Sequence, residues 1–408
     1  MKTIKILLFI LIFLLLFVFK GQPQQVKFNL YANYTRESRV FNKHSLWNPD
    51  LVFESGSGET LSRLLINPET RLKWGRTRWM FSPMLTCNEN NEVKFKLREY
   101  YVVLEWRDFE ITAGKVIIKL GTGYMFTPIS VVTPEREISD PEDSLRANQG
   151  VELLKLDYYK ENVNLSAMVF KKNNRANAAL LVYCHLAGID WYGIVYYPEY
   201  KKIQWGAAFS TTIGDQVEIH GEWMLRKQSP VNVHRVYFEP DPRVHYLTDS
   251  LYNPGAGNYN EYIIGANITF SKINIIAEYY HKDWGLKAEW FDKLKSYYNF
   301  NFEIAPNPLQ SPDVLSGLSV IQQGTRGLMR NYLFLRAAWP FQKNIDLSGI
   351  LFMNLYDTGS VVVFSLDHRL TEGIYLYLKP VFFIGKKGSE FSESWYGHSL
   401  QLGIKGVF

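Results

Sequence analysis

Apolar and polar side chains alternate with a period of two in one segment after another of this chain. Residues 162–170, for example, place Val163, Leu165 and Val169 on one side of an extended backbone and Asn164 on the other. Successive side chains of a β-strand point to opposite faces, so each such segment predicts a strand with one apolar and one polar face. The chain is therefore expected to be all-β.

The pattern predicts about eighteen strands, with sixteen as the nearest alternative. Strands of ~9–12 residues that recur along a whole chain are typical either of a soluble sandwich or barrel or of a transmembrane antiparallel β-barrel. The expected strands lie near residues 26–35, 60–67 (the weakest), 71–81, 93–106, 109–121, 150–158, 162–170, 178–186, 190–198, 202–211, 215–227, 260–270, 273–282, 330–340, 344–356, 359–368, 373–384 and 397–408.

The N-terminus has the layout of a secretory signal peptide. A basic start precedes an uninterrupted apolar stretch, Ile6–Phe19, and a polar exit. We expect residues 1–22 to be this signal and residues 23–408 to form a single domain, with a retained anchor helix as the alternative. Beyond Lys20 no apolar run reaches the ~18–20 residues of a spanning helix, which excludes a membrane protein built from several helices.

Three features favour a barrel in a Gram-negative outer membrane over a soluble one. Tyr and Trp gather near the ends of the expected strands, as in the aromatic girdles at the two membrane interfaces. The signal peptide supplies an export route. The last strand ends on Phe408, which resembles the signal read by the outer-membrane assembly machinery, although Gly406 stands where an aromatic or apolar residue is usual. Membrane lipid and lipopolysaccharide are then the expected surroundings.

The lengths of the connections agree with this interpretation. Bacterial barrels have an even number of strands, short periplasmic turns and longer outer loops. With eighteen strands, every long connection follows an odd-numbered strand, and tight links such as Arg107-Asp108 follow even-numbered ones, so both termini are expected to be periplasmic. The expected outer loops are 36–59, 122–149, 228–259 and 283–329; the second is a candidate for folding into the lumen and the fourth for a lid or plug.

Part of the chain resembles a known family. The stretch Leu97–Val102, followed by Ile111–Lys115 and Gly121–Gly123, is similar to a hairpin of the alginate-export-like group of bacterial outer-membrane porins. The similarity covers residues 93–158, with Lys115 in place of the usual arginine. It implies an eighteen-stranded channel with a polar, charged lumen. It names no solute, because the group includes exporters of anionic polysaccharide and members of unassigned solute.

The phase of the alternation changes within the same hairpin. Apolar positions are odd-numbered from Phe109 to Ala113 and even-numbered from Val116 to Leu120, which predicts a β-bulge at Gly114. After the bulge the nearby lysines would face the lumen, since an unpaired lysine on the lipid face costs ~2–4 kcal/mol near the midplane. The candidate lumen-lining residues are Arg98, Glu99, Glu105, Glu110, Lys115, Lys119, Glu218, Glu222, Arg226, Arg336 and Lys379.

These charges have two interpretations that the sequence leaves open. Rows of both signs across a barrel wall set a transverse field that selects ions or sugars. The same rows also hold a wall together and keep the lumen hydrated.

No catalytic, cofactor or metal site is expected. Gly121-x-Gly123 lacks the third glycine and the strand–helix unit of a nucleotide-binding loop. His398-Ser399 invites comparison with outer-membrane phospholipases, but neighbours in sequence point to opposite faces of a strand, and no G-x-S-x-G elbow is present.

The formal charge of +5 falls to +2 without the signal peptide, so the basic footprint of a nucleic-acid-binding protein is absent. Cys87 and Cys184 lie far apart in the sequence, which does not decide whether they pair. The sequence therefore predicts an outer-membrane channel for small or oligomeric polar or charged solutes, with a polar or anionic solute in its lumen. An adhesive or scaffold barrel is the alternative, and a phospholipase-like hydrolase is the third possibility.

Overall fold

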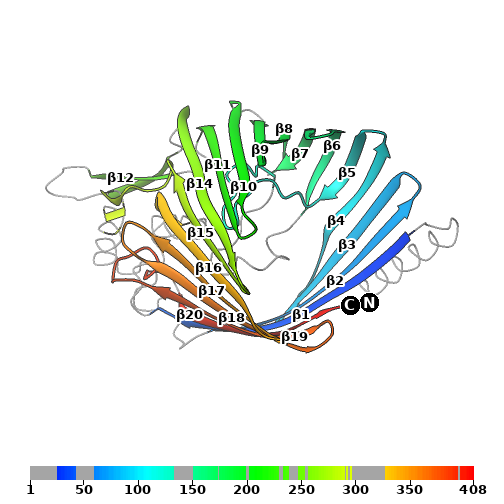
Figure 1. Cartoon of the computed structure of the whole chain (residues 1–408). Helices are drawn as coiled ribbons and strands as arrows, with labels where there is room; N and C mark the ends of the chain where they lie inside the picture. The colour runs from blue at the N-terminus through cyan, green and yellow to red at the C-terminus, as the bar shows by residue number, and fades with distance from the viewer. Residues whose placement is uncertain are drawn as a thin grey trace.

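The computed structural model describes residues 25–42, 59–132, 150–172, 174–198, 202–228, 233–238, 247–252, 256–289, 291–292, 295, 327–393 and 396–408. The expected signal peptide lies outside these ranges. Within them, no helix combines the length and the apolar character needed to cross a membrane. Figure 1 shows that the described strands surround a common interior.

The barrel is closed, antiparallel and eighteen-stranded, which confirms the expected fold class and strand number. Each strand pairs with its neighbours along the sequence, and the first and last close the ring with Tyr31 opposite Val407. The strands are β1 (Gln25–Phe41), β2 (Glu59–Trp74), β3 (Thr77–Asn88), β4 (Val93–Trp106), β5 (Phe109–Val116), β6 (Val151–Lys160), β7 (Val163–Lys172), β8 (Arg175–Leu186), β9 (Ile189–Pro198), β10 (Gln204–Ile213), β11 (Val217–Gln228), β14 (Ala256–Phe270), β15 (Ile273–Lys282), β16 (Asn331–Gln342), β17 (Ile345–Asn354), β18 (Ser360–Thr371), β19 (Ile374–Ile384) and β20 (Tyr396–Val407).

The apolar faces of the strands point outward. Along β7, the side chains of Val163, Leu165 and Val169 are 41–55% exposed, whereas those of Ser166 and Phe170 are 2–4% exposed. A soluble barrel would bury the first set in its own core. Exposed apolar rows that alternate with inward polar or packed side chains are the pattern of a barrel surrounded by lipid.

The two ends of the barrel differ. Short turns join β4 to β5 at Arg107-Asp108 and β14 to β15 at Ser271-Lys272, with φ of 53° at Arg107 and 56° at Ser271, as two-residue hairpin turns require. Trp106 projects outward beside the first of these turns. The long connections after β1, β5, β11 and β15 all leave the opposite end.

The boundary between β2 and β3 differs from the prediction. β2 continues through Pro68 to Trp74, although the sequence placed a strand end before that proline. A proline cannot donate to a ladder, and Pro68 lies near a second one, Pro83, where the β2–β3 register is interrupted. Asn67 fills the gap: its Nδ2 donates to Ser82 Oγ at 2.8 Å and to the Pro83 carbonyl at 2.7 Å.

A separate two-stranded ladder was not expected from the sequence. β12 (Val233–Phe238) and β13 (Leu247–Tyr252) pair with each other within the connection between β11 and β14. In Figure 1 this ladder projects to the side of the barrel wall. Its strands are 6 residues each, too short for their alternation to stand out from a loop.

Candidate functional site

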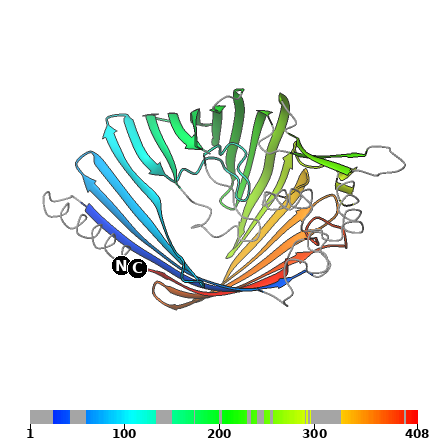
Figure 2. The same ribbon diagram turned by 180° about the vertical axis from the view of Figure 1, so that it is seen from behind.

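After β5 the chain leaves the barrel wall and enters the interior, as both Figure 1 and Figure 2 show. The register of β5 with β4 and β6 is continuous through Gly114, so the expected β-bulge does not occur. Val116 is instead the last wall residue, and Ile118 and Leu120 pack inside the barrel. The change of apolar phase therefore marks the start of the inner segment, the name used here for residues 117–132.

The inner segment packs against one side of the interior. Ile129 and Val131 belong to a buried apolar cluster with Met224 of β11 and with residues of β6 to β10. Phe126 stacks on Tyr280 of β15, with ring centroids 4.0 Å apart, within a second cluster that extends to β19. Apolar burial of this kind is worth about 25 cal/mol per Å². The expected inward folding of 122–149 is thus observed for residues 122–132, and the rest of that loop lies outside the described residues.

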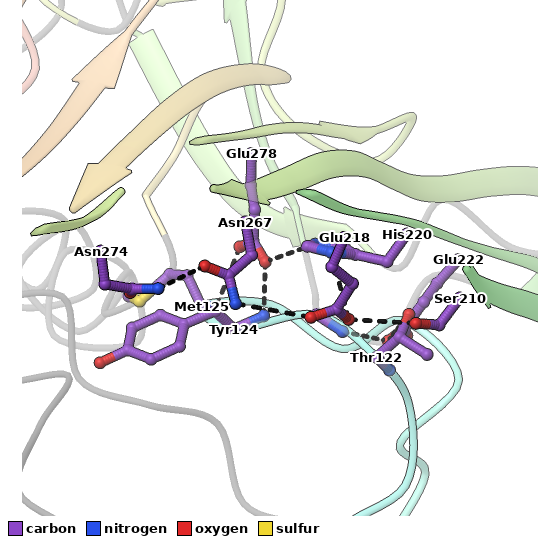
Figure 3. A network of polar contacts seen from close by, with 11 residues as sticks. Thr122, Tyr124, Met125, Ser210, Glu218, His220, Glu222, Asn267, Asn274 and Glu278 are labelled. Atoms are coloured by element: carbon purple, nitrogen blue, oxygen red, sulfur yellow. Dashed lines mark hydrogen bonds and ion pairs between the residues drawn. The ribbon is translucent and has the colours of Figure 1, made fainter. Parts of the chain in front are cut away.

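Glu222 of β11 holds the inner segment by its backbone. Its Oε1 accepts hydrogen bonds from the amides of Thr122 at 2.5 Å and Gly123 at 2.7 Å, and its Oε2 accepts one from Ile129 at 3.2 Å. The side chain is only 3% exposed. A buried carboxylate costs free energy unless its oxygens are paired, and here the amides of the segment supply the partners (Figure 3).

Glu278 of β15 provides a second hold. Its Oε1 accepts from the amide of Tyr124, and its Oε2 accepts from the amide of Met125 at 2.9 Å. His220 of β11 is hydrogen-bonded to the same carboxylate, with its Nε2 3.0 Å from Oε1. This contact crosses β14 at Gly265, where a Cβ would lie 2.6 Å from the imidazole Nε2.

The motif Gly121-x-Gly123 is therefore a carboxylate-binding turn. Gly121 has φ of +94°, and a Cβ there would lie 2.4 Å from Glu222 Oε1. Only glycine combines that backbone conformation with that approach. Consecutive amides turned towards one anion form the type of concavity that binds anions in many proteins. Here the anion is the protein's own side chain, which explains the motif without a nucleotide.

Cations hold the carbonyl groups of the same segment. Arg226 Nη2 donates to the Pro128 carbonyl at 3.1 Å and also pairs with Glu261 of β14. Lys172 Nζ donates to the Val131 carbonyl at 2.8 Å. The backbone of the segment is thus tied to the wall by charged side chains of both signs.

The wall of β2 to β4 carries a second group of charges. By register these side chains point inward, alternating with exposed outward ones such as Leu64 and Leu104. Cations outnumber carboxylates among them: Arg63, Arg71, Lys73, Arg78, Lys94, Lys96 and Arg98 against Glu69, Glu99 and Glu105.

Lys115 is the candidate whose position differs from the prediction. Because the ladder is continuous, Lys115 lies opposite Tyr100 in the outward row, and its Nζ donates to the Leu97 carbonyl at 2.6 Å. Lys115 therefore does not face Glu99 and Glu105, which lie on the inward face of β4. Glu99 accepts from the Ile117 amide at 3.0 Å.

Arg78, which was not among the candidates, joins two that were. It pairs with Glu105 at 2.7 Å and with Glu110 at 2.5 Å. Two of the other candidates make hydrogen bonds: Arg98 donates to Asn67 at 2.9 Å, and Glu218 accepts from Ser210 at 3.0 Å. Lys119 is exposed on the inner segment, Arg336 lies 5.3 Å from the centre of the Tyr124 ring, and Lys379 faces inward opposite Gln401. The backbone of Phe408 pairs with that of Leu30 beside the junction of β1 and β20.

A buried carboxyl group also stands where the connection between β19 and β20 folds over β16 and β17. Glu390 accepts from the Tyr332 hydroxyl at 2.8 Å, from Asn354 Nδ2 at 2.9 Å and from the amide of Leu328. Leu328 lies at the end of the connection that was expected to form a lid, and its neighbour Met329 packs into the apolar cluster of the inner segment. Burial raises the pKa of Glu390 to about 7.

This pKa predicts a pH dependence of stability. The folded protein binds the Glu390 proton more tightly than the unfolded chain, whose carboxyl titrates near 4.5. The free energy of unfolding should therefore fall as the pH rises from about 4.5 to 7. We expect Glu390→Gln to flatten this slope, measured by urea unfolding in lipid vesicles across that range. Identical slopes for the two proteins would contradict the assignment.

Comparisons with known proteins identify the fold. No family model matches the sequence, and no curated protein matches it. The structure is similar to Pseudomonas aeruginosa OccK2 (OpdF) in complex with glucuronate, with a TM-score of 0.59 and 9% identity over 95% of this chain and 99% of that one. It is also similar to P. aeruginosa OccK5 (OpdH), with a TM-score of 0.57, 9% identity and the same coverage. Acinetobacter baumannii OccAB1 has a TM-score of 0.57 at 7% identity, over 95% of this chain and 98% of that one. The fold is thus the closed eighteen-stranded barrel of outer-membrane channels.

Proposed function

We propose that the protein is an outer-membrane channel through which small polar or anionic solutes pass. The observation that carries this proposal is the division of the barrel interior: the inner segment packs against the side from β6 to β19, and the wall of β2 to β4 keeps its charged side chains inward. The outward apolar rows supply the lipid-facing surface that such a channel needs. Both termini of the barrel are then periplasmic, and Phe408 serves as the assembly signal.

Two observations support an anionic solute. Cations outnumber carboxylates on the wall of β2 to β4, and a barrel of the same fold, OccK2, is known in complex with glucuronate. The resemblance of residues 93–158 to the alginate-export-like group also favours an anionic solute, because that group includes exporters of anionic polysaccharide. We therefore propose carboxylate-bearing small molecules as the preferred class.

Conductance across a planar lipid bilayer tests the channel itself. The purified protein should insert from detergent and give discrete current steps. A protein that inserts as a folded barrel and never conducts, with or without its inner segment, would favour the alternative of an adhesive or scaffold barrel.

Charge reversal on β4 tests the preference for anions. Lys96→Glu with Arg98→Glu should move the reversal potential in a salt gradient towards cations, because both side chains lie on the inward face. The matched control is Arg36→Glu, which changes an exposed outward arginine in the row of Tyr34. A reversal potential that is the same in the double variant and the wild type would place these two cations off the conduction path.

A further inference from the structure

The inner segment is held in an unusual way. None of its described residues belongs to a strand or a helix, and the backbone groups of these residues are held by charged side chains of the wall. Five amides, those of Thr122, Gly123, Tyr124, Met125 and Ile129, donate to the two carboxylates of Glu222 and Glu278.

We propose that Glu222 and Glu278 act as a latch whose contacts position the inner segment, and that the segment is a movable part of the pore. This inference rests on the proposed channel function and adds a moving part to it. A β-ladder would fix the segment through many backbone pairs that no single side chain controls. Two carboxylates hold five of its amides, beside the contacts of Arg226 and Lys172 with its carbonyl groups, so two side chains control most of its backbone hydrogen bonds to the wall.

Each carboxylate accepts with both oxygens. Oε1 of Glu222 takes two amides and Oε2 takes a third, while Oε1 of Glu278 takes one amide and contacts His220, and Oε2 takes another amide. A glutamine in either place turns one acceptor into an NH₂ donor that faces an N–H donor. At least one charge-assisted bond is then lost at each site, and such bonds are the strong ones.

The wall behind the latch is not expected to collapse when it opens. Glu222 and Glu278 lie on β11 and β15, whose ladders with β14 are continuous through both positions. The barrel therefore keeps its strands, and the change is confined to the segment and its apolar contacts.

The experiment measures current and segment mobility on the same variants. Glu222→Gln, Glu278→Gln and the double variant are compared with Glu152→Gln, which removes an exposed outward carboxylate on β6. A nitroxide label is placed on the inner segment at Thr127→Cys, with Cys87 and Cys184 changed to Ser. We expect each latch variant to raise the ratio of released to held segment by about 10- to 100-fold. The released state should appear as a mobile component in the nitroxide spectrum and as extra open-channel current noise, and the Glu152→Gln protein should show neither.

The outcomes separate the latch from the channel. A nitroxide as immobile in the double variant as in the wild type, with unchanged current noise, would overturn the latch. If the wild type never conducts, the channel proposal falls, and the nitroxide spectra still decide whether the two carboxylates hold the segment. Should the double variant fail to fold, the two single variants decide, since each leaves the other carboxylate in place.

Discussion

Replacing residues 117–150 by an Asn-Gly turn should raise the single-channel conductance several-fold. Val116 and Val151 are the last paired residues of β5 and β6 and lie directly opposite each other, so a two-residue turn can close the hairpin without moving either strand. The deletion removes the inner segment and leaves the wall of the barrel complete. Conductance should rise because the area of the pore that is open to ions increases by the area that the segment occupies.

The same deletion has a cost in stability. Tyr280, Phe334 and Phe352, which are 0–1% exposed beneath the segment and its neighbours, would meet water. The free energy of unfolding should therefore decrease. The control replaces residues 89–92, between β3 and β4 at the same end, by the same turn. Equal conductance in the deletion, the control and the wild type would show that the segment does not limit the current.

The sequence predicts the barrel well because the residues of each strand are by themselves enough to indicate that strand. Alternation such as that of Val163, Leu165 and Val169 is local, and the side of the strand that faces lipid follows from the residue types alone. The error at β2 has the same origin: Pro68 is a local signal for a break, and the compensation by Asn67 comes from contacts with a different strand. The missed ladder of β12 and β13 is too short to give a periodic signal.

The latch is the part that the sequence could not provide. Glu222 and the amide it accepts from, that of Thr122, are separated by 100 residues, and Glu278 is 154 residues from Tyr124. Glu222 was a candidate because it lies on a polar face, and Glu278, on an equivalent face, was not. The one local signal was Gly121-x-Gly123, which indicates a turn with exposed amides but does not say which anion they bind. The sequence prediction placed the Lys115 side chain on the wrong face of the strand for a related reason. A shift in the alternation of apolar residues is the same in the sequence whether the strand contains a bulge or ends.

Exchanging two adjacent residues of β16 should destabilise the barrel although the composition of the protein stays the same. Leu335 lies in an outward row between Ala277 and Leu351, and Arg336 lies inward over the ring of Tyr124. The double change Leu335→Arg with Arg336→Leu places the arginine in lipid, which costs ~2–4 kcal/mol near the bilayer midplane. We expect the free energy of unfolding in vesicles, measured by urea titration, to fall by about this amount.

The single variant Arg336→Leu is the matched control for the exchange. It removes the inward guanidinium from Tyr124 and leaves the outward face of β16 untouched, so the exchange differs from this control only at the outward position 335. A cation over an aromatic ring is worth about 0.5–1 kcal/mol at exposed sites and ~2 or more when desolvated. The exchange should therefore be less stable than this control by most of the cost of an arginine in lipid. Equal unfolding free energies for the two would mean that Leu335 does not face hydrocarbon, and the lipid-facing assignment of the whole outward surface would then fail with it.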